Sequence, residues 1–102
     1  MTMMKKATKV MSPLRVGNQV FVRSVTHYYT GRIVLLTKDE IVLEDACWIA
    51  CTARMAEWLK TGAPNCGGYE AEYEPFAGPV SLGRGAVIDV TDWPHALPRE
   101  QR

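Results

Sequence analysis

Short stretches in which hydrophobic and polar residues alternate recur along most of the chain, and this pattern is typical of half-buried β-strands. The stretches that predict strands are residues 19–25, 29–36, 41–46, 79–82 and 86–90. Tight turns separate them, at Lys38-Asp39-Glu40 and at Gly83-Arg84-Gly85. Because each stretch also contains Val or Ile, residues that favour strands, the chain is predicted to be mainly β.

The hydrophobic spacing changes to that of a helix over residues 52–61, where the recurring apolar residues are Met55, Trp58 and Leu59. Thr52 is a candidate N-cap, because its hydroxyl oxygen can accept a hydrogen bond from the first turn. Gly62 is a candidate for the residue that ends the helix. We therefore predict one helix between the third and fourth strands, followed by a loop over 62–78 that contains prolines and glycines.

Short strands in this order favour a small barrel over a layered α/β domain. Gly31 lies inside the second strand, where a residue without a Cβ tolerates the sharp bend that a barrel needs. We predict a single barrel domain over residues 16–92, a flexible basic tail over 1–15 and a C-terminal tail over 93–102. The exposed edges of such a barrel can pair with a strand of a second copy, so we expect a homo-oligomer.

The formal net charge is +1, which argues against a strongly basic nucleic-acid coat protein. Basic residues gather near the N-terminus, at Lys5, Lys6, Lys9 and Arg15. Acidic residues gather in the predicted loop, at Glu70, Glu72 and Glu74. The N-terminal lysines precede no apolar segment of the kind found in a signal peptide, and no apolar run has the length of a membrane span. We expect a cytoplasmic protein without a membrane partner.

The chain contains three cysteines, Cys47, Cys51 and Cys66, which we interpret as reduced thiols. Their spacing lacks the Cys-x-x-Cys unit of common zinc sites, so neither a metal nor another cofactor is expected. Glu44 and Asp45 point to opposite faces of a strand, which argues against a pair of acid/base carboxylates. The sequence contains no phosphate loop, dinucleotide fingerprint or Gly-x-Ser-x-Gly elbow. It therefore predicts a protein that is not an enzyme.

Two segments resemble the motifs of Sm-like proteins. The first contains Gly31, the turn at Asp39 and residues 42–46, and the second is residues 82–87. The chain departs from the Sm pattern because Ile41 follows the turn in place of an asparagine, and because the predicted helix separates the motifs. The resemblance implies a bent five-stranded barrel of Sm or SH3-like type with one inserted α-helix. It also implies that the arginine of the second motif lies beside the nucleic-acid-binding pore of a ring.

Residues 20–99 also resemble a family of small proteins encoded by tailed phages and their prophages. The segments that carry this resemblance are residues 22–26, 29–32, 43–46, 48–50, 59–62, 74–76, 83–85 and 95–98. The resemblance implies a phage origin, and hence a bacterial host cell as the place of action. It implies no particular chemistry.

Arg84, between Gly83 and Gly85, is the leading candidate for a ligand-binding residue. The two glycines let the backbone come close to a ligand, and the guanidinium group can stack on a base or bind a phosphate. The alternative is an ordinary turn in which Arg84 pairs with Asp89 or Glu44.

His27, Tyr28 and Tyr29 form the second candidate site, because aromatic rings beside a histidine suit stacking on a nucleobase. The alternative is a tyrosine pair with one ring in the core and one on an exposed face of the strand. Four further residues are candidates for the core or for a subunit interface, namely Trp48, Met55, Trp58 and Trp93.

Three functions are compatible with these features. The first is a non-enzymatic homo-oligomer that binds a small nucleotide-type anion and thereby removes a host immune signal. The second is an Sm-like ring that binds single-stranded RNA or DNA, which would share Arg84 but would need a basic stripe. The third is a structural module of a virion or a module that binds a host protein.

Overall fold

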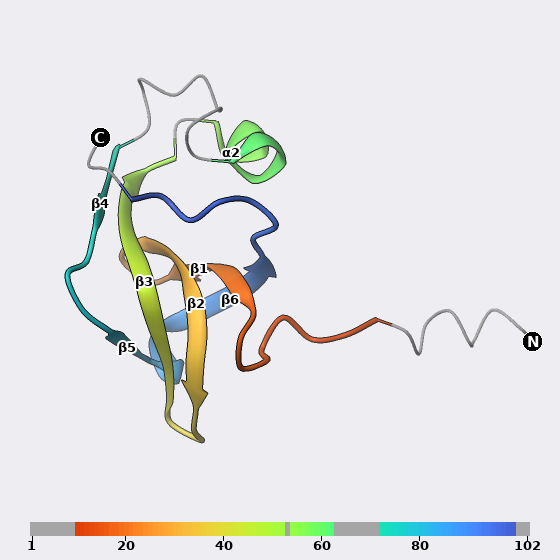
Figure 1. Cartoon of the computed structure of the whole chain (residues 1–102), viewed down its shortest axis with the longest axis vertical. Helices are drawn as coiled ribbons and strands as arrows, with labels where there is room; N and C mark the ends of the chain where they lie inside the picture. Colours follow the sequence, from red (N-terminus) through yellow and green to blue (C-terminus); the bar gives the residue numbers. More distant parts are fainter. Residues whose placement is uncertain (1–9, 53, 63–71, 100–102) are drawn as a thin grey trace, which may run out of the picture.

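The computed structural model describes residues 10–52, 54–62 and 72–99, which fold into a six-stranded antiparallel sheet with one α-helix (Figure 1). The strands are β1 (Gln19–Ser24), β2 (Tyr28–Leu36), β3 (Glu40–Cys51), β4 (Glu72–Pro75), β5 (Val80–Gly83) and β6 (Val87–Asp92). The α-helix is α2 (Met55–Thr61), and a short 3₁₀ helix, η3 (Arg84–Ala86), precedes β6. The fold class predicted from the sequence, a mainly β, barrel-like protein with one helix, is confirmed.

The long strand β3 pairs with two different strands along one of its edges. Its first residues pair with β5, from Glu40↔Gly83 to Leu43↔Val80. Its last residues pair with β4, from Cys47↔Pro75 to Cys51↔Glu72. The strand order is β4-β3-β2-β1-β6, with β5 also attached to β3. The predicted fourth strand is β5, which follows β4 along the same edge of β3. The described residues therefore form six strands, whereas the sequence predicts five.

Strand β4 lies inside the segment 62–78 that the sequence predicts to be a loop, so that prediction is wrong for residues 72–75. Tyr73 is buried, whereas Glu72 and Glu74 on either side of it are exposed. This alternation of buried and exposed residues is typical of a strand, but it covers only four residues and ends at Pro75. Because the segment is short, acidic and ends in a proline, its sequence resembles that of a loop. Residues 63–71 of the predicted loop, including Cys66 and Glu70, lie outside the described residues.

The sheet bends where Gly31 of β2 meets β3. A Cβ at Gly31 would lie 3.0 Å from the Leu43 Cβ and 3.3 Å from the Ala46 Cα, so only glycine allows the two strands to come this close. The β2–β3 register shifts at the same place, between Thr30 and Arg32. Opposite this shift, Asp45 has a φ of 52°, in the left-handed region. The predicted bend at Gly31 therefore coincides with an irregularity in both strands.

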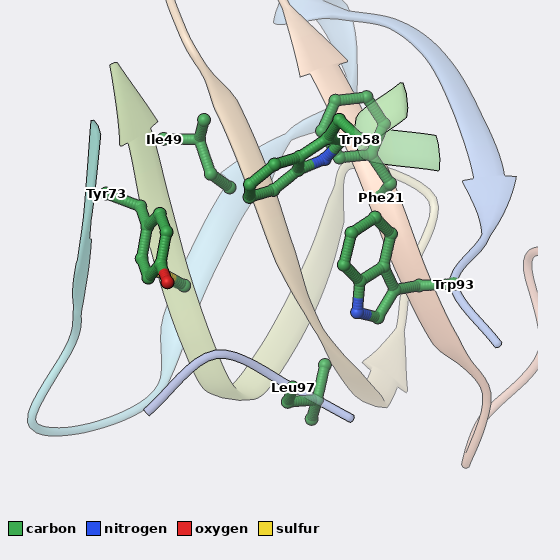
Figure 2. Close-up of a cluster of buried hydrophobic side chains, with 7 residues drawn as sticks. Phe21, Ile49, Trp58, Tyr73, Trp93 and Leu97 are labelled. Carbon is green, nitrogen blue, oxygen red and sulfur yellow. The ribbon is translucent and has the colours of Figure 1, made fainter. Parts of the chain in front are cut away.

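The sheet buries residues on both of its faces, in two separate hydrophobic clusters. We call the first cluster, made entirely of strand residues, the sheet core: Val20, Val22, Ile33, Ile41, Leu43, Ala46 and Leu82. We call the second cluster the helix core, because Trp58 of α2 belongs to it: Phe21, Cys47, Ile49, Trp58, Tyr73, Trp93 and Leu97 (Figure 2). Strand β1 contributes to both, since successive side chains of a strand point to opposite faces.

The C-terminal segment, which the sequence predicts to be a tail, covers the helix core as far as it is described. Trp93 is 1% exposed, and its indole N–H donates to the Ala96 carbonyl at 3.2 Å. The His95 Nε2–H donates to the Leu59 carbonyl at 2.9 Å, which ties the segment to α2. Leu97 is also buried. The contact between His95 and Leu59 joins residues far apart in the sequence, so local patterns cannot reveal it.

Helix α2 ends as predicted but begins later than predicted. Gly62 has a φ of 85°, and its N–H donates to the Trp58 carbonyl at 3.1 Å, so it ends the helix. The N-cap is Arg54, without a side-chain hydrogen bond, and the predicted N-cap Thr52 follows the last residue of β3. No helix in the described part of the chain is long and apolar enough to cross a membrane. Residues 1–9 of the predicted basic tail, with Lys5, Lys6 and Lys9, lie outside the described residues.

The close approach at Gly31 predicts that Gly31→Ala lowers the free energy of unfolding by about 1–3 kcal/mol, because the added methyl group pushes β3 away. Gly78→Ala is the matched control, since a Cβ there would meet nothing within 4 Å. The control should change the stability by less than about 0.5 kcal/mol. Urea unfolding of both variants measures the difference. Equal effects of the two substitutions would contradict the proposed bend.

Candidate functional site

The loop that contains Arg84 connects two turns of the sheet. The Arg84 N–H donates to the Asp39 carbonyl at 2.9 Å, in the turn between β2 and β3. The Val25 N–H, in the turn between β1 and β2, donates to the Ala86 carbonyl at 2.9 Å. The hydrogen bond to Asp39 therefore brings together the two segments that resemble Sm motifs.

The side chain of Arg84 is half-buried, and its Nε is buried without a hydrogen-bond partner. Neither carboxylate of the alternative turn interpretation is bonded to it, because Asp89 binds Arg23 and Glu44 binds Arg32. Among the described residues, Arg84 takes part in no ion pair. A buried N–H without an acceptor costs about 1–3 kcal/mol, and the same state is found at Thr30 Oγ1 and Trp58 Nε1.

Three arginines are bound to carboxylates, whereas Arg84, like Arg15 and Arg54, forms no ion pair among the described residues. The Arg32 guanidinium donates to Asp45 at 2.6 Å and to Glu44 at 3.1 Å, and Arg99 donates to Asp45 at 3.2 Å. The hydrogen bond from Arg32 holds the pKa of Asp45 below its usual value. Arg23 binds Asp89 through two nitrogens, and this hydrogen bonding lowers the pKa of Asp89 in the same way.

The glycines on either side of Arg84 leave the backbone open. A Cβ at Gly83 or at Gly85 would meet nothing within 4 Å, and both residues are exposed. Gly83 has an ordinary extended backbone, with a φ of −69°, so neither packing nor strain requires a glycine there. The space beside the loop is therefore accessible to a group that approaches the backbone closely.

The predicted aromatic site is divided between two faces of the sheet. Tyr28 turns towards the helix core and packs on Phe21, with 5.7 Å between the ring centroids. Tyr29 stacks on Phe76 at 6.3 Å, and His27 packs on Trp48 at 4.7 Å. Tyr28 and Tyr29 thus lie on opposite faces of the sheet, as in the alternative, but Tyr29 is half-buried against the sheet core and does not lie on an exposed face.

His27, Tyr29, Trp48 and Phe76 form what we call the aromatic row. Tyr29 and Trp48 are register partners on β2 and β3, and Trp48 is in turn the partner of Glu74 on β4. Trp48, Glu74, Pro75 and Phe76 line a cavity of about 410 Å³. The sequence pattern alone does not single out Phe76 as a candidate site residue. Phe76 is an aromatic residue between Pro75 and Ala77, in a segment of low hydrophobicity. Its position next to Trp48 follows only from the pairing of β4 with β3.

Arg84 and the aromatic residues predicted with it do not touch. No ring contact or hydrogen bond joins the Arg84 side chain to His27, Tyr28 or Tyr29 within the described ranges. The link between them is the backbone hydrogen bond from Val25, two residues before His27, to Ala86. The loop and the aromatic row are therefore two neighbouring features rather than one closed pocket.

Two of the residues predicted to form the core or an interface are core residues. Trp58 is 0% exposed and Trp93 is 1% exposed, and their ring centroids lie 5.2 Å apart (Figure 2). Neither offers a surface to a second subunit in this structure, which corrects their assignment as interface residues. Met55 is half-buried against the same cluster. Trp48 is half-buried in the aromatic row and keeps an accessible surface.

The described cysteines differ in their surroundings. Cys47 is buried in the helix core, and burial raises its pKa to about 12, so it is a neutral thiol near pH 7. Cys51 is exposed. Among the residues that the structure describes, no three His, Cys, Asp or Glu side chains lie close enough together to hold a metal ion.

Comparisons of the chain with protein-family models, with curated proteins and with solved structures find no match, so the geometry of the site has to carry any argument about function.

If Arg84 serves a ligand and not the fold, Arg84→Met should leave the free energy of unfolding unchanged or raise it, because a buried N–H without a partner is removed. Arg32→Met should lower it by up to about 1 kcal/mol, because Asp45 and Glu44 lose the guanidinium between them. Urea unfolding at neutral pH compares the two variants. A larger loss for Arg84→Met than for Arg32→Met would show that Arg84 is a structural residue.

Proposed function

We propose that this protein is a non-enzymatic binding protein for a small nucleotide-type anion, with Arg84 as the residue that binds phosphate. The observation that carries the proposal is the half-buried Arg84 side chain, whose Nε has no acceptor and which forms no ion pair in the described part of the chain. Proteins rarely leave such a group unsatisfied. Thr30 Oγ1 and Trp58 Nε1 are also buried without a partner, but both residues are fully buried, whereas Arg84 is half-buried beside the open backbone of Gly83 and Gly85, where a ligand can reach it.

A phosphate is the anion that suits this loop. The planar guanidinium group offers several N–H donors, which match the oxygens of a phosphate in pairs. The open backbone at Gly83 and Gly85 lets the phosphate approach the loop without meeting a side chain. The protein has a formal net charge of only +1, so a local contact and not a general positive field would provide the affinity.

The aromatic row supplies a second part of the binding surface in this proposal. His27 and Tyr29 follow the turn that Val25 joins to Ala86, and bases stack favourably on such rings. Tyr28 supports them from the core side. A nucleotide bound through both parts would span the surface from Arg84 towards His27.

We further propose that the protein is a homo-oligomer. The strand order leaves β4 and β6 at the two ends of the sheet, and each pairs with one other strand among the described residues. Ile88 of β6 is 59% exposed, which is unusual for a large apolar residue unless another surface covers it. Pairing of these edges between copies would satisfy the free backbone groups.

The phage resemblance suggests the setting of this function. A small oligomer that binds a nucleotide tightly, without converting it, would lower the free concentration of that nucleotide in the cytoplasm of the bacterial host. We therefore propose sequestration of a host immune signal as the biological role. This part rests on the resemblance and not on the geometry.

A second candidate function is an Sm-like ring that binds single-stranded RNA or DNA. One observation favours it, namely the hydrogen bond between Arg84 and Asp39 that joins the two Sm-like segments. A third candidate, a virion or host-protein interaction module, is favoured by the exposed Phe76, which is 40% accessible. Salt separates the first two, because the affinity for a nucleic acid falls steeply as salt rises, whereas that of a pocket for a single nucleotide changes less.

The proposal predicts that calorimetric titration with nucleoside monophosphates and cyclic dinucleotides detects at least one ligand. Arg84→Met should weaken this binding by about tenfold or more, because a charge-assisted hydrogen bond is lost. Arg54→Met, which removes the same charge from an exposed position, is the matched control and should bind like the parent protein. Equal binding by parent and Arg84→Met, or no binding of any compound in the panel, would refute the proposal.

Native mass spectrometry of the protein isolated from its host tests the oligomer and the ligand in one measurement. We expect a mass of several chains together with retained small molecules. A single chain without a ligand, isolated together with another protein, would favour the interaction module instead.

A further inference from the structure

A cavity of about 290 Å³ lies between α2 and the strand pair β1–β6, on the face of the sheet that carries the helix core. The described residues that line it are Phe21, Arg23, Met55, Leu59, Asp89 and Thr91. The volume is close to the lower end of the range of small-molecule sites, which is roughly 300–1,000 Å³. None of these residues belongs to the Arg84 loop or to the aromatic row, so the cavity is a separate feature.

The strand side of the cavity consists of two register pairs. Phe21 pairs with Thr91, and Arg23 pairs with Asp89. Phe21 and Arg23 are two residues apart on β1, so their side chains point to the same face of the sheet. Phe21 therefore forms an apolar part of the wall, and Arg23 and Asp89 form a charged part beside it.

The helix side of the cavity is apolar. Met55 and Leu59 are four residues apart on α2, so they lie on the same face of the helix. Both are half-buried against the helix core, in which Phe21 is 1% exposed (Figure 2). The flexible side chain of a methionine adapts to the shape of its neighbours, and its sulfur packs favourably against aromatic rings. This part of the cavity therefore suits the apolar ring of a small molecule.

The ion pair between Arg23 and Asp89 supplies the polar part. The Arg23 Nε donates to the two Asp89 carboxylate oxygens at 2.9 and 3.0 Å, and the Arg23 Nη2 also donates to Asp89. The third guanidinium nitrogen, Nη1, forms no hydrogen bond with any described residue, so its N–H groups can donate to a ligand. Hydrogen bonding from Arg23 lowers the pKa of Asp89, which keeps this carboxylate an ionised acceptor at neutral pH. The two side chains are 42% and 44% exposed, so a ligand can reach them.

A neutral carboxamide matches this ion pair better than a charged group does. Arg23 would attract an anion but Asp89 would repel it, and for a cation the two effects are reversed. A carboxamide has a carbonyl oxygen that accepts hydrogen bonds and an amino group that donates them. It can therefore bond to the Arg23 Nη1 and to the Asp89 carboxylate at the same time, and the ion pair stays intact.

We propose that the cavity between α2 and the β1–β6 pair binds a small aromatic carboxamide. The ring packs against Phe21, Met55 and Leu59, and the carboxamide bonds to Arg23 and Asp89. The proposal does not rest on the nucleotide function, because it uses other residues and an uncharged ligand.

The methyl signals of isotope-labelled methionines provide a direct test, with benzamide as the probe. Met55 lines the cavity, whereas Met11 is 64% exposed outside it and serves as an internal control. Titration with benzamide should shift the Met55 signal in a saturable manner and leave the Met11 signal in place. The Met55→Leu and Met11→Leu variants assign the two signals.

Related compounds separate the carboxamide from the ring, and they require no change to the protein. Acetophenone keeps the ring and the carbonyl group but cannot donate a hydrogen bond, so it should bind about two- to tenfold more weakly than benzamide. Toluene lacks both polar groups and should bind more weakly still. Benzoate should also bind more weakly than benzamide, because Asp89 repels its charge.

A matched pair of variants tests the contact with Arg23. Arg23→Lys keeps a positive charge beside Asp89 but loses the planar guanidinium group, so it should weaken benzamide binding by about two- to tenfold. Arg54→Lys makes the same change at an exposed position outside the cavity and should bind benzamide like the parent protein.

Four results would overturn the proposal. One is no saturable shift of the Met55 signal at any benzamide concentration up to the solubility limit. Another is equal affinity for toluene and benzamide, since the cavity would then select only for apolar surface. The third is tighter binding of benzoate than of benzamide, since Arg23 would then form an anion site. The fourth is equal affinity of Arg23→Lys and the parent protein for benzamide, since Arg23 would then not contact the carboxamide.

Discussion

The bend in β3 is the constraint on which the rest of this structure depends. Gly31 lets β2 approach Leu43 and Ala46, and the left-handed backbone of Asp45 takes up the extra residue in β3. The hydrogen bond from Arg32 to Asp45, at 2.6 Å, holds this conformation from the neighbouring strand. β3 pairs with β5 before this irregularity and with β4 after it.

The bend also decides which side chains reach each face. Before Asp45, Ile41 and Leu43 point into the sheet core, whereas after it Cys47 and Ile49 belong to the helix core. Trp48 is consequently left on the side of the sheet where Tyr29 and Glu74 are its register partners. The helix core is buried under α2 and the C-terminal segment, whereas Tyr29 on the other face packs against the sheet core.

The sequence predicts those parts of the fold that depend on local patterns. The strands, the glycine in the bend and the end of α2 at Gly62 follow from alternation and from backbone preferences. Strand β4 and the packing of Trp93 do not, because they depend on contacts with β3 and α2 that are distant in the sequence. The candidate site residues differ in the same way. Arg84 can be singled out from the sequence by the glycines on either side of it, whereas Phe76 becomes a candidate only because the fold places it near Trp48.

Cross-strand nuclear Overhauser effects along β3 test the central claim most directly. The account predicts contacts from Ile41 to Leu82 and from Ile49 to Tyr73 in the same sample, because β3 pairs with β5 and β4 in turn. It also predicts a contact between Gly31 and the Leu43 side chain. Contacts of β5 that continue past Ala46, or the absence of any contact between Tyr73 and β3, would contradict it.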